Sequence, residues 1–201
     1  MSNSDRKQCS VIDALVVSAR SDRQAFGRLY EAYYERILRY CLRRLCQRSV
    51  AEDVCGEVFL YVARNMRSFR GTTEQDFRRW VYRIATTEVN AYLRRTIRRK
   101  ELWDDALQKN LLSTRESVNH DESHESMDWS SVYQAISQLS TKEQAVITLR
   151  LFEEMPYDEI AQVLSIRSGA ARVAYSRAIK KLRGLLSADS AEAGDRTIRR
   201  V

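Results

Sequence analysis

The chain has 201 residues, 44% of them hydrophobic, and carries 34 Lys and Arg against 27 Asp and Glu, a formal net charge of +7. This length suffices for one large domain or two small ones. One proline, six glycines and abundant Leu, Ala, Arg and Glu favour an all-α protein over any sheet fold. No apolar run could span a bilayer and the N-terminus lacks a signal-peptide core, so we expect a cytoplasmic protein without membrane insertion.

The charges are arranged in blocks along the chain. Residues 20–100 carry 19 basic and 9 acidic side chains, residues 101–131 carry 2 and 8, and residues 132–187 carry 8 and 5. Two basic blocks predict contact with a phosphate backbone, which would repel the acidic segment between them. We therefore expect an N-terminal extension at 1–22, a helical domain at 23–100, an acidic linker at 101–131, a second helical domain at 132–187 and a polar tail at 188–201.

Two amphipathic helices are predicted after a short apolar patch, Val11 to Val17, that could add a helical turn or two. The first runs from Arg23 to Arg48, with apolar residues at i, i+3, i+4 and i+7 spacing. The second begins at Ser49, and its predicted buried stripe comprises Val50, Val54, Val58, Tyr61 and Val62. Glu52, Asp53 and Glu57 project from its other faces. Acids on an otherwise basic domain indicate a surface for a protein partner. Alternatively, they are ordinary acids of the kind that the helix dipole favours near a helix start.

The stretch from Phe69 to Lys100 predicts a Gly-containing turn followed by a long helix that is both aromatic and cationic. One broad face can be buried, with Phe77, Val81 and Ile84 at helical spacing. The helix ends in a cluster of cations, namely Arg94, Arg95, Arg98, Arg99 and Lys100. This cluster is typical of a nucleic-acid surface, or of a solvated helix end whose cations lie near the negative end of the dipole.

We expect neither a metal nor a cofactor. His120 and His124 in the acidic segment resemble a two-histidine metal helix, but no apolar residue between Val118 and Met127 could wall a pocket around them. The four cysteines, Cys9, Cys41, Cys46 and Cys55, contain no C-x-x-C pair. Cys41 and Cys55 occupy apolar helix positions, which predicts buried thiols.

The second basic block predicts a helix-turn-helix. Ser140 and Glu143 have capping-box spacing. A short helix from Tyr157 to Leu164, the connector Ser165–Arg167 and a helix from Ser168 to Leu186 follow, and the inner stripe of the last helix is Ala171, Tyr175, Ala178 and Leu182. Ser168, Arg172, Val173 and Ser176 would then face base edges, and Arg167, Arg177, Lys180 and Lys181 would contact phosphates. The alternative is a plain helical hairpin with a cationic face.

In combination these segments resemble the bacterial sigma factors of the extracytoplasmic-function class. The resemblance rests on AEDVCGEVF at 51–59, on FRG followed by FRRWVYRIATTEVNAYLRR, and on the stretch from Leu139 to Leu186. It implies two helical domains that act with core RNA polymerase, through the clamp helices of its largest subunit and through its flap. It also implies binding to promoter DNA, single-stranded and duplex, and control by an anti-sigma factor or another regulator.

The resemblance assigns residues to each role. Those implied in polymerase binding are Glu52, Asp53, Glu57 and Phe59. Those implied at the minus-ten element are Arg70, Thr72, Thr73, Arg78, Arg79, Trp80, Tyr82, Arg83, Asn90, Arg94 and Arg95. Those implied at the minus-thirty-five element are Arg167, Ser168, Arg172, Val173, Ser176, Arg177 and Lys180. We expect the loop from Gly71 to Asp76 to read an unpaired base, and Trp80 to be a core residue or a wedge at the duplex edge.

The chain departs from the family pattern in the polymerase-binding segment and in the recognition helix. Gly56 replaces a common Gln in the polymerase-binding segment, and Ala174 replaces a phosphate-binding Arg of the recognition helix. The sequence thus predicts a non-enzymatic initiation factor with its own promoter preference. A stand-alone helix-turn-helix regulator is the alternative, but it would need a ligand-binding or dimerisation module in place of the first domain.

Overall fold

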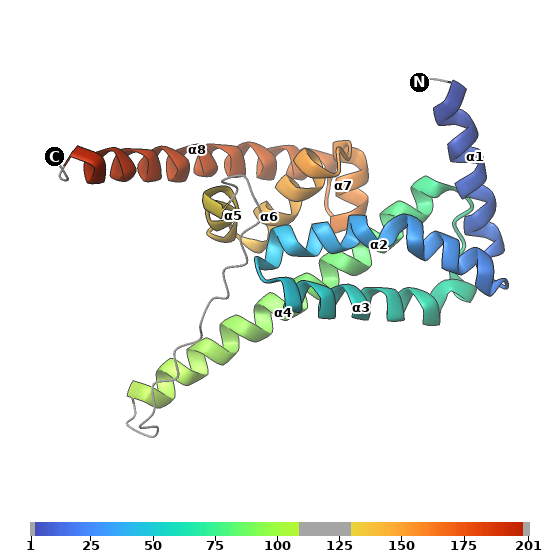
Figure 1. Ribbon diagram of the computed structural model, residues 1–201, viewed down its shortest axis with the longest axis horizontal. Coiled ribbons are helices and arrows are strands. Elements are labelled where there is room, and N and C mark those ends of the chain that lie inside the picture. The colour runs from blue at the N-terminus through green and yellow to red at the C-terminus, as the bar shows by residue number, and fades with distance from the viewer. Residues whose placement is uncertain (1–2, 109–129, 199–201) are drawn as a thin grey trace.

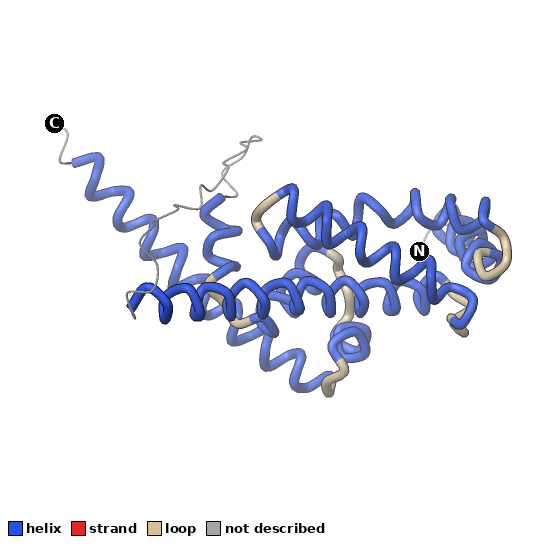
Figure 2. The backbone as a smooth tube through the Cα atoms, turned by 90° about the horizontal axis from the view of Figure 1, so that it is seen from below, coloured by secondary structure: helices blue, strands red, loops and turns tan. Residues whose placement is uncertain are grey.

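The computed structural model describes residues 3–108 and 130–198 of the chain. Every regular element in those residues is helical, and Figure 2 shows no strand among them. The prediction of an all-α protein is therefore confirmed. The helices form two groups, one before and one after residues 109–129, which lie outside the described residues together with the predicted His120 and His124 pair.

Four helices make up the first group (Figure 1): α1 (Asn3–Ser18), α2 (Arg23–Leu45), α3 (Arg48–Asn65) and α4 (Glu74–Gln108). α2 contacts the other three helices. Its buried residues include Leu29, Tyr33, Ile37 and Tyr40, which recur every three or four positions and so share one face. The helix predicted from Arg23 is confirmed, and it ends at Leu45.

Local chemistry explains where α2 begins and ends. The side chain of Asp22 accepts a hydrogen bond of 2.8 Å from the N–H of Gln24, which caps the first turn. Cys46 has a φ of 56°, the left-handed conformation in which many helices end, and its N–H donates to the carbonyl of Leu42. A short 3-10 turn, η1 (Met66–Ser68), later leads from α3 toward α4.

The second group comprises α5 (Ser130–Ser137), α6 (Thr141–Ile147), the π-helical turn η2 (Thr148–Phe152), α7 (Tyr157–Leu164) and α8 (Ser168–Ile198). The predicted capping box is confirmed at the start of α6. The N–H of Ser140 donates to the Glu143 carboxylate at 3.0 Å, and the N–H of Glu143 donates to the Ser140 hydroxyl at 3.4 Å. Hydrogen bonds from Ser140 and Lys181 hold the pKa of Glu143 below its usual value.

The helix-turn-helix is confirmed, because α7 has the predicted bounds and α8 begins at the predicted residue. Between the two helices Ser165 adopts a φ of 53°, and the N–H of Ile166 donates to the carbonyl of Ala161 at 2.9 Å. Ala171, Ala178 and Leu182 of the predicted inner stripe are buried. The opposite face of α8 therefore remains available.

Two helices extend beyond the boundaries expected from the sequence. α4 continues past Lys100 to Gln108, into the predicted linker, and α8 continues past Leu186 to Ile198, into the predicted polar tail. The apolar periodicity stops at the predicted boundaries, but a helix that has already formed can propagate through good helix formers without a new nucleation cost. Figure 1 shows both helices as long rods.

The core is continuous between the two groups. Val81 and Val89 of α4 belong to the same buried cluster as Met155 and Ile160 of the second group, and α4 packs directly against α7. A smaller cluster lies within the second group and contains Ala135, Ile136, Leu139, Ile147, Ala178 and Leu182. The two groups therefore pack as one body through α4 and α7.

Cys41 and Cys55 are buried thiols without a disulfide, as predicted. Burial raises the pKa of both, that of Cys55 to about 12. Within residues 3–108 and 130–198, no three His, Cys, Asp or Glu side chains lie close enough together to hold a metal ion. Among the described helices, none has an apolar stretch that would reach across a membrane.

Candidate functional site

The exposed side of α3 presents the predicted acids next to large apolar side chains. Asp53 and Glu57 are exposed one turn apart. Leu60 and Tyr61 follow on the same side and are 48% and 47% exposed. The prediction that Tyr61 is buried is wrong, because it lies one turn after Glu57 on the outer side. The acidic face of α3 comprises Glu52, Asp53, Glu57, Leu60 and Tyr61.

Phe59, assigned with these acids, supports the helix from inside. It is 6% exposed, and its ring packs edge-on against Tyr30 at 4.7 Å between centroids. Phe59 therefore shapes the acidic face of α3 without being part of it. Gly56 lies among the exposed residues, and a Cβ at that position would meet no atom within 4 Å. Sequence reasoning missed Leu60 and Tyr61 as surface residues. Leu60 follows Gly56 by four residues and Tyr61 follows Asp53 by eight, and this helical spacing could have placed both on the exposed side of α3.

The loop before α4 is closely packed. A Cβ on Gly71 would lie 2.4 Å from both the Cβ of Asp76 and the Cζ of Phe69, so a larger residue would displace the loop. The Phe69 ring in turn stacks on Trp80 at 4.5 Å between centroids. Trp80 is half-buried by this contact.

Asp76 organises the residues that were expected to read an unpaired base. Its carboxylate accepts hydrogen bonds from the N–H groups of Thr72 at 3.1 Å and Thr73 at 3.2 Å. Its own N–H donates to the Thr73 hydroxyl at 3.1 Å, which completes a capping box at the start of α4. Hydrogen bonds to the Asp76 carboxylate, above all the one from the Thr73 hydroxyl, hold the pKa of Asp76 below its usual value. Both threonines remain exposed.

A pocket of about 190 Å³ lies beside this loop, between α4 and α7. It is lined by Asp76, Arg79, Trp80, Arg83 and Gln162. Arg79 pairs with Asp76 at 2.5 Å, and Arg83 donates to the backbone carbonyl of Gln162. The pocket is thus surrounded by an indole, two guanidinium groups, a carboxylate and an amide. Its α7 side is formed by Gln162.

The residues predicted at the minus-ten element divide into an exposed and a covered set. The exposed members are Arg70, Thr72, Thr73, Arg83, Arg94 and Arg95. Arg78, Arg79, Trp80 and Asn90 are half-buried, and Tyr82 is fully buried. In this arrangement Tyr82 packs edge-on against Tyr40 at 5.4 Å and offers no face to a base.

Glu153, which follows η2, occupies the centre of the covered set. Its carboxylate accepts a hydrogen bond from Arg43 at 3.0 Å and another from the Tyr82 hydroxyl. Its backbone carbonyl accepts from Arg78 at 3.1 Å. The Glu153 side chain is only 7% exposed. Burial, and secondarily this carboxylate, raise the pKa of Tyr82.

Glu159 of α7 makes a second contact with α4. Its carboxylate accepts a hydrogen bond from Gln75 at 2.6 Å and forms an ion pair with Arg78 at 3.7 Å. Two acids of the second helical group therefore lie against the cationic side of α4, where the negative charge of DNA is expected. Sequence reasoning missed Glu153, Glu159 and Arg43, because nothing local in the sequence indicates which distant residues they meet.

Arg44 adds a further link between the groups. Its side chain is buried, with the residue 2% exposed, and it donates to Asn90 Oδ1 at 2.8 Å and to the carbonyl of Thr141 at 3.1 Å. It also donates to the Tyr40 hydroxyl at 3.2 Å. Asn90, predicted to contact DNA, is thus engaged by Arg44 here.

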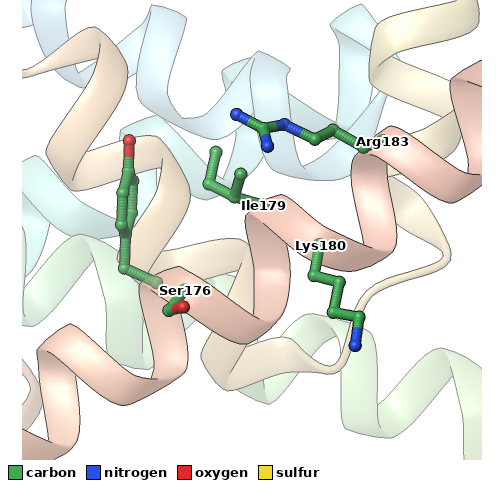
Figure 3. Close-up of a pocket in the computed structure, with 5 residues that line it drawn as sticks. Ser176, Ile179, Lys180 and Arg183 are labelled. Carbon is green, nitrogen blue, oxygen red and sulfur yellow. The ribbon is translucent and has the colours of Figure 1, made fainter.

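The outer face of α8 carries most of the residues predicted at the minus-thirty-five element. Arg172, Val173, Ser176, Arg177 and Lys180 are exposed, as is Arg167 in the connector, whereas Ser168 is half-buried. A pocket of about 570 Å³ runs along this helix and is lined by Tyr175, Ser176, Ile179, Lys180 and Arg183. Figure 3 shows Lys180 and Arg183 extending from the helix in different directions. The predicted contact residues therefore share one accessible surface.

Both helical groups match families of known proteins. Residues 29–99 match the family Sigma-70 region 2, and residues 130–182 match Sigma-70, region 4. The ECF RNA polymerase sigma-E factor of Haemophilus influenzae is 30% identical over 165 residues, which cover 79% of this chain and 86% of that protein. The ECF RNA polymerase sigma factor BldN of Streptomyces coelicolor is 27% identical over 187 residues, which cover 92% of this chain and 69% of that protein.

A solved structure has the same fold. The sigma factor RpoE of Bartonella quintana, in complex with the anti-sigma factor NepR, superposes with a TM-score of 0.62 at 18% identity, and the match covers 82% of this chain and 98% of that one. The chain belongs to the extracytoplasmic-function class of RNA polymerase sigma factors. It is an alternative sigma factor that directs promoter-specific transcription initiation, and the stand-alone regulator is not favoured. Its named relatives are initiation factors and not enzymes.

Proposed function

We propose that the acidic face of α3 is the surface through which this sigma factor binds the clamp helices of the largest subunit of core RNA polymerase, with the flap as a second contact. The observation that carries this proposal is the exposure of Asp53 and Glu57 beside Leu60 and Tyr61 on a domain that is otherwise basic. Apolar and aromatic side chains with a charged rim are typical of protein interfaces. The acids would attract a basic partner and repel DNA.

The loop from Gly71 to Asp76 and the cationic side of α4 hold the melted minus-ten element in this proposal. Thr72 and Thr73 are exposed in a loop whose backbone is fixed by Asp76. Exposed Arg94 and Arg95 would follow the phosphate backbone of the unpaired strand. Trp80 would act as a wedge at the edge of the duplex, and its stacking on Phe69 supports this role.

The outer face of α8 reads the minus-thirty-five element as duplex DNA. Arg172 and Ser176 carry hydrogen-bonding groups suited to base edges, and Val173, 50% exposed, is suited to a thymine methyl. Arg167, Arg177 and Lys180 lie on the same exposed surface and would contact phosphates.

DNA binding at α4 requires the two helical groups to separate. Arg78, Tyr82 and Arg83 contact Glu153, Glu159 or Gln162 in the described arrangement, and these contacts occupy the surface that would receive the unpaired strand. The described arrangement is therefore the inactive one, and binding to polymerase draws the groups apart.

The remaining roles rest on family membership. RpoE of Bartonella quintana was solved with an anti-sigma factor, and we propose that an anti-sigma factor or another regulator also holds this chain. The protein acts in the cytoplasm, where its polymerase and promoter DNA are found, with no membrane insertion. It uses no cofactor and catalyses no reaction of its own.

Charge reversal on the acidic face of α3 tests the polymerase contact. Asp53→Lys and Glu57→Lys should abolish promoter-specific transcription by the reconstituted holoenzyme and weaken co-purification with core polymerase. Glu154→Lys, an exposed acid after η2, makes the same charge change elsewhere and should leave polymerase binding unchanged. Full transcription by both α3 variants would refute the assignment.

A further inference from the structure

The N-terminal helix α1 reaches the loop that precedes α4. α1 packs on both α2 and α4, as Figure 1 shows, and Val16 and Ala19 are buried in that contact. Asp13 lies on α1, and Arg20 lies in the turn that follows the end of α1 at Ser18. Both are half-buried, and neither belongs to the region 2 match, which begins at residue 29.

These two side chains hold the loop at both ends. The Asp13 carboxylate accepts a hydrogen bond from the N–H of Glu74, the first residue of α4. That N–H has no partner within its own helix, so Asp13 caps α4 from a different helix. The Arg20 guanidinium donates to the backbone carbonyl of Gly71. The two contacts bracket the exposed Thr72 and Thr73.

The loop is therefore fixed from two sides. Asp76 binds the N–H groups of Thr72 and Thr73 from within α4. Asp13 of α1 binds Glu74 after them, and Arg20 in the turn after α1 binds Gly71 before them. Fixing the backbone of one residue costs about 1–2 kcal/mol of conformational entropy. A loop ordered in the free protein does not incur that cost again when it binds a ligand.

We propose that Asp13 and Arg20 are positioning residues, which hold the loop from Gly71 to Glu74 in the conformation that discriminates one unpaired base of the minus-ten element. The inference rests on the proposed function of that loop. Neither residue contacts DNA. They act by removing the alternative loop conformations in which Thr72 and Thr73 would meet any base equally well.

The test is promoter selection by reconstituted holoenzyme. Core polymerase with wild-type or variant protein selects from a duplex DNA library randomised over the minus-ten and minus-thirty-five positions, and base preference is measured at each position. Asp13→Ala should reduce preference at a minus-ten position by on the order of tenfold and leave the minus-thirty-five preferences unchanged. Asp13→Asn keeps an oxygen acceptor and should restore the preference. Arg20→Met keeps the apolar stem and provides a second variant should Asp13→Ala not fold.

Asp22→Ala is the matched control. It removes a carboxylate cap of the same kind, from α2, without touching the loop. It should lower thermal stability comparably but keep the minus-ten preference. Unchanged preference in both Asp13→Ala and Arg20→Met, or an equal loss in Asp22→Ala, would overturn the inference alone. A wild-type holoenzyme with no minus-ten preference would overturn the proposed function of the loop as well.

Discussion

Arg172 and Arg177 are both exposed on α8, but their surroundings differ. The Arg172 guanidinium lies 5.6 Å from the centroid of the Tyr157 ring, which restrains it near the start of the recognition helix. The first turns of such a helix are the part that enters the major groove. Arg177 lies one to two turns further along, where in the proposed complex the helix would leave the base edges and approach the phosphate backbone.

We expect Arg172→Ala to cost about 1–3 kcal/mol of binding at one base position of the minus-thirty-five element. Arg177→Ala should weaken binding equally on all sequences, because a phosphate contact carries no base information. Holoenzyme binding to a set of duplexes with single base changes measures both effects. A uniform loss with Arg172→Ala would make Arg172 a phosphate contact.

Burial of single residues was the least predictable feature. Periodicity correctly identified Asp53 and Glu57 as outward residues, yet it assigned Tyr61 to the core, although that residue is 47% exposed. The resemblance placed Phe59 and Tyr82 in contact surfaces, whereas the structure buries both. Tyr82 packs against Tyr40 of α2 and donates to Glu153, which is distant in sequence.

Elements were predicted well wherever a local signal marks their ends. The capping box at Ser140 fixed the start of α6, and the tight connector through Ser165 fixed the end of α7. These signals act within a few residues and are therefore readable from sequence. The far ends of α4 and α8 carry no comparable signal, and both helices continue past the last residue of their apolar stripes.

The packing of α1 shows a different limit of sequence reasoning. The apolar patch from Val11 to Val17 predicted a helical turn or two, and the structure has a longer helix there that packs on α2 and α4. Asp13 on this helix and Arg20 in the turn after it gave no signal, because their partners are backbone groups of the loop near Gly71. A hydrogen bond between a side chain and a backbone group far away in the chain cannot be predicted from a single sequence.

At the scale of the whole molecule, the two helical groups are held together by contacts between distant parts of the chain. Arg43 and Glu153 are 110 residues apart, and Tyr82 and Glu153 are 71 residues apart. The sequence predicted both groups and the basic character of α4. It could not predict that acids of the second group would cover that basic side, since the charge blocks show only that each group is basic overall.

Glu153→Lys should shift the free protein toward the separated arrangement. A lysine would face Arg43 and leave the Tyr82 hydroxyl without its acceptor. While the open form is rare, each loss of about 1.4 kcal/mol in the stability of the closed arrangement raises the population of the open form about tenfold. The apparent affinity for single-stranded minus-ten DNA rises in proportion to that population. Fluorescence anisotropy measures this affinity, and small-angle scattering measures the radius of gyration, which should increase.

Glu154→Lys is the control for that experiment, because it adds the same charge at the next, exposed residue. It accounts for any general attraction of DNA to a more basic chain. Equal DNA affinity in the two variants would mean that Glu153 does not keep the groups together.

We expect the chain to select promoters only as a subunit of RNA polymerase. An electrophoretic shift on promoter DNA, measured with and without core polymerase, tests this dependence. We predict a sequence-specific complex when both proteins are present, and only weak, salt-sensitive binding by the chain alone, because the second helical group covers part of the cationic side of α4 and α8 alone offers a small surface. Tight, sequence-specific binding by the chain without polymerase would show that it recognises promoters on its own.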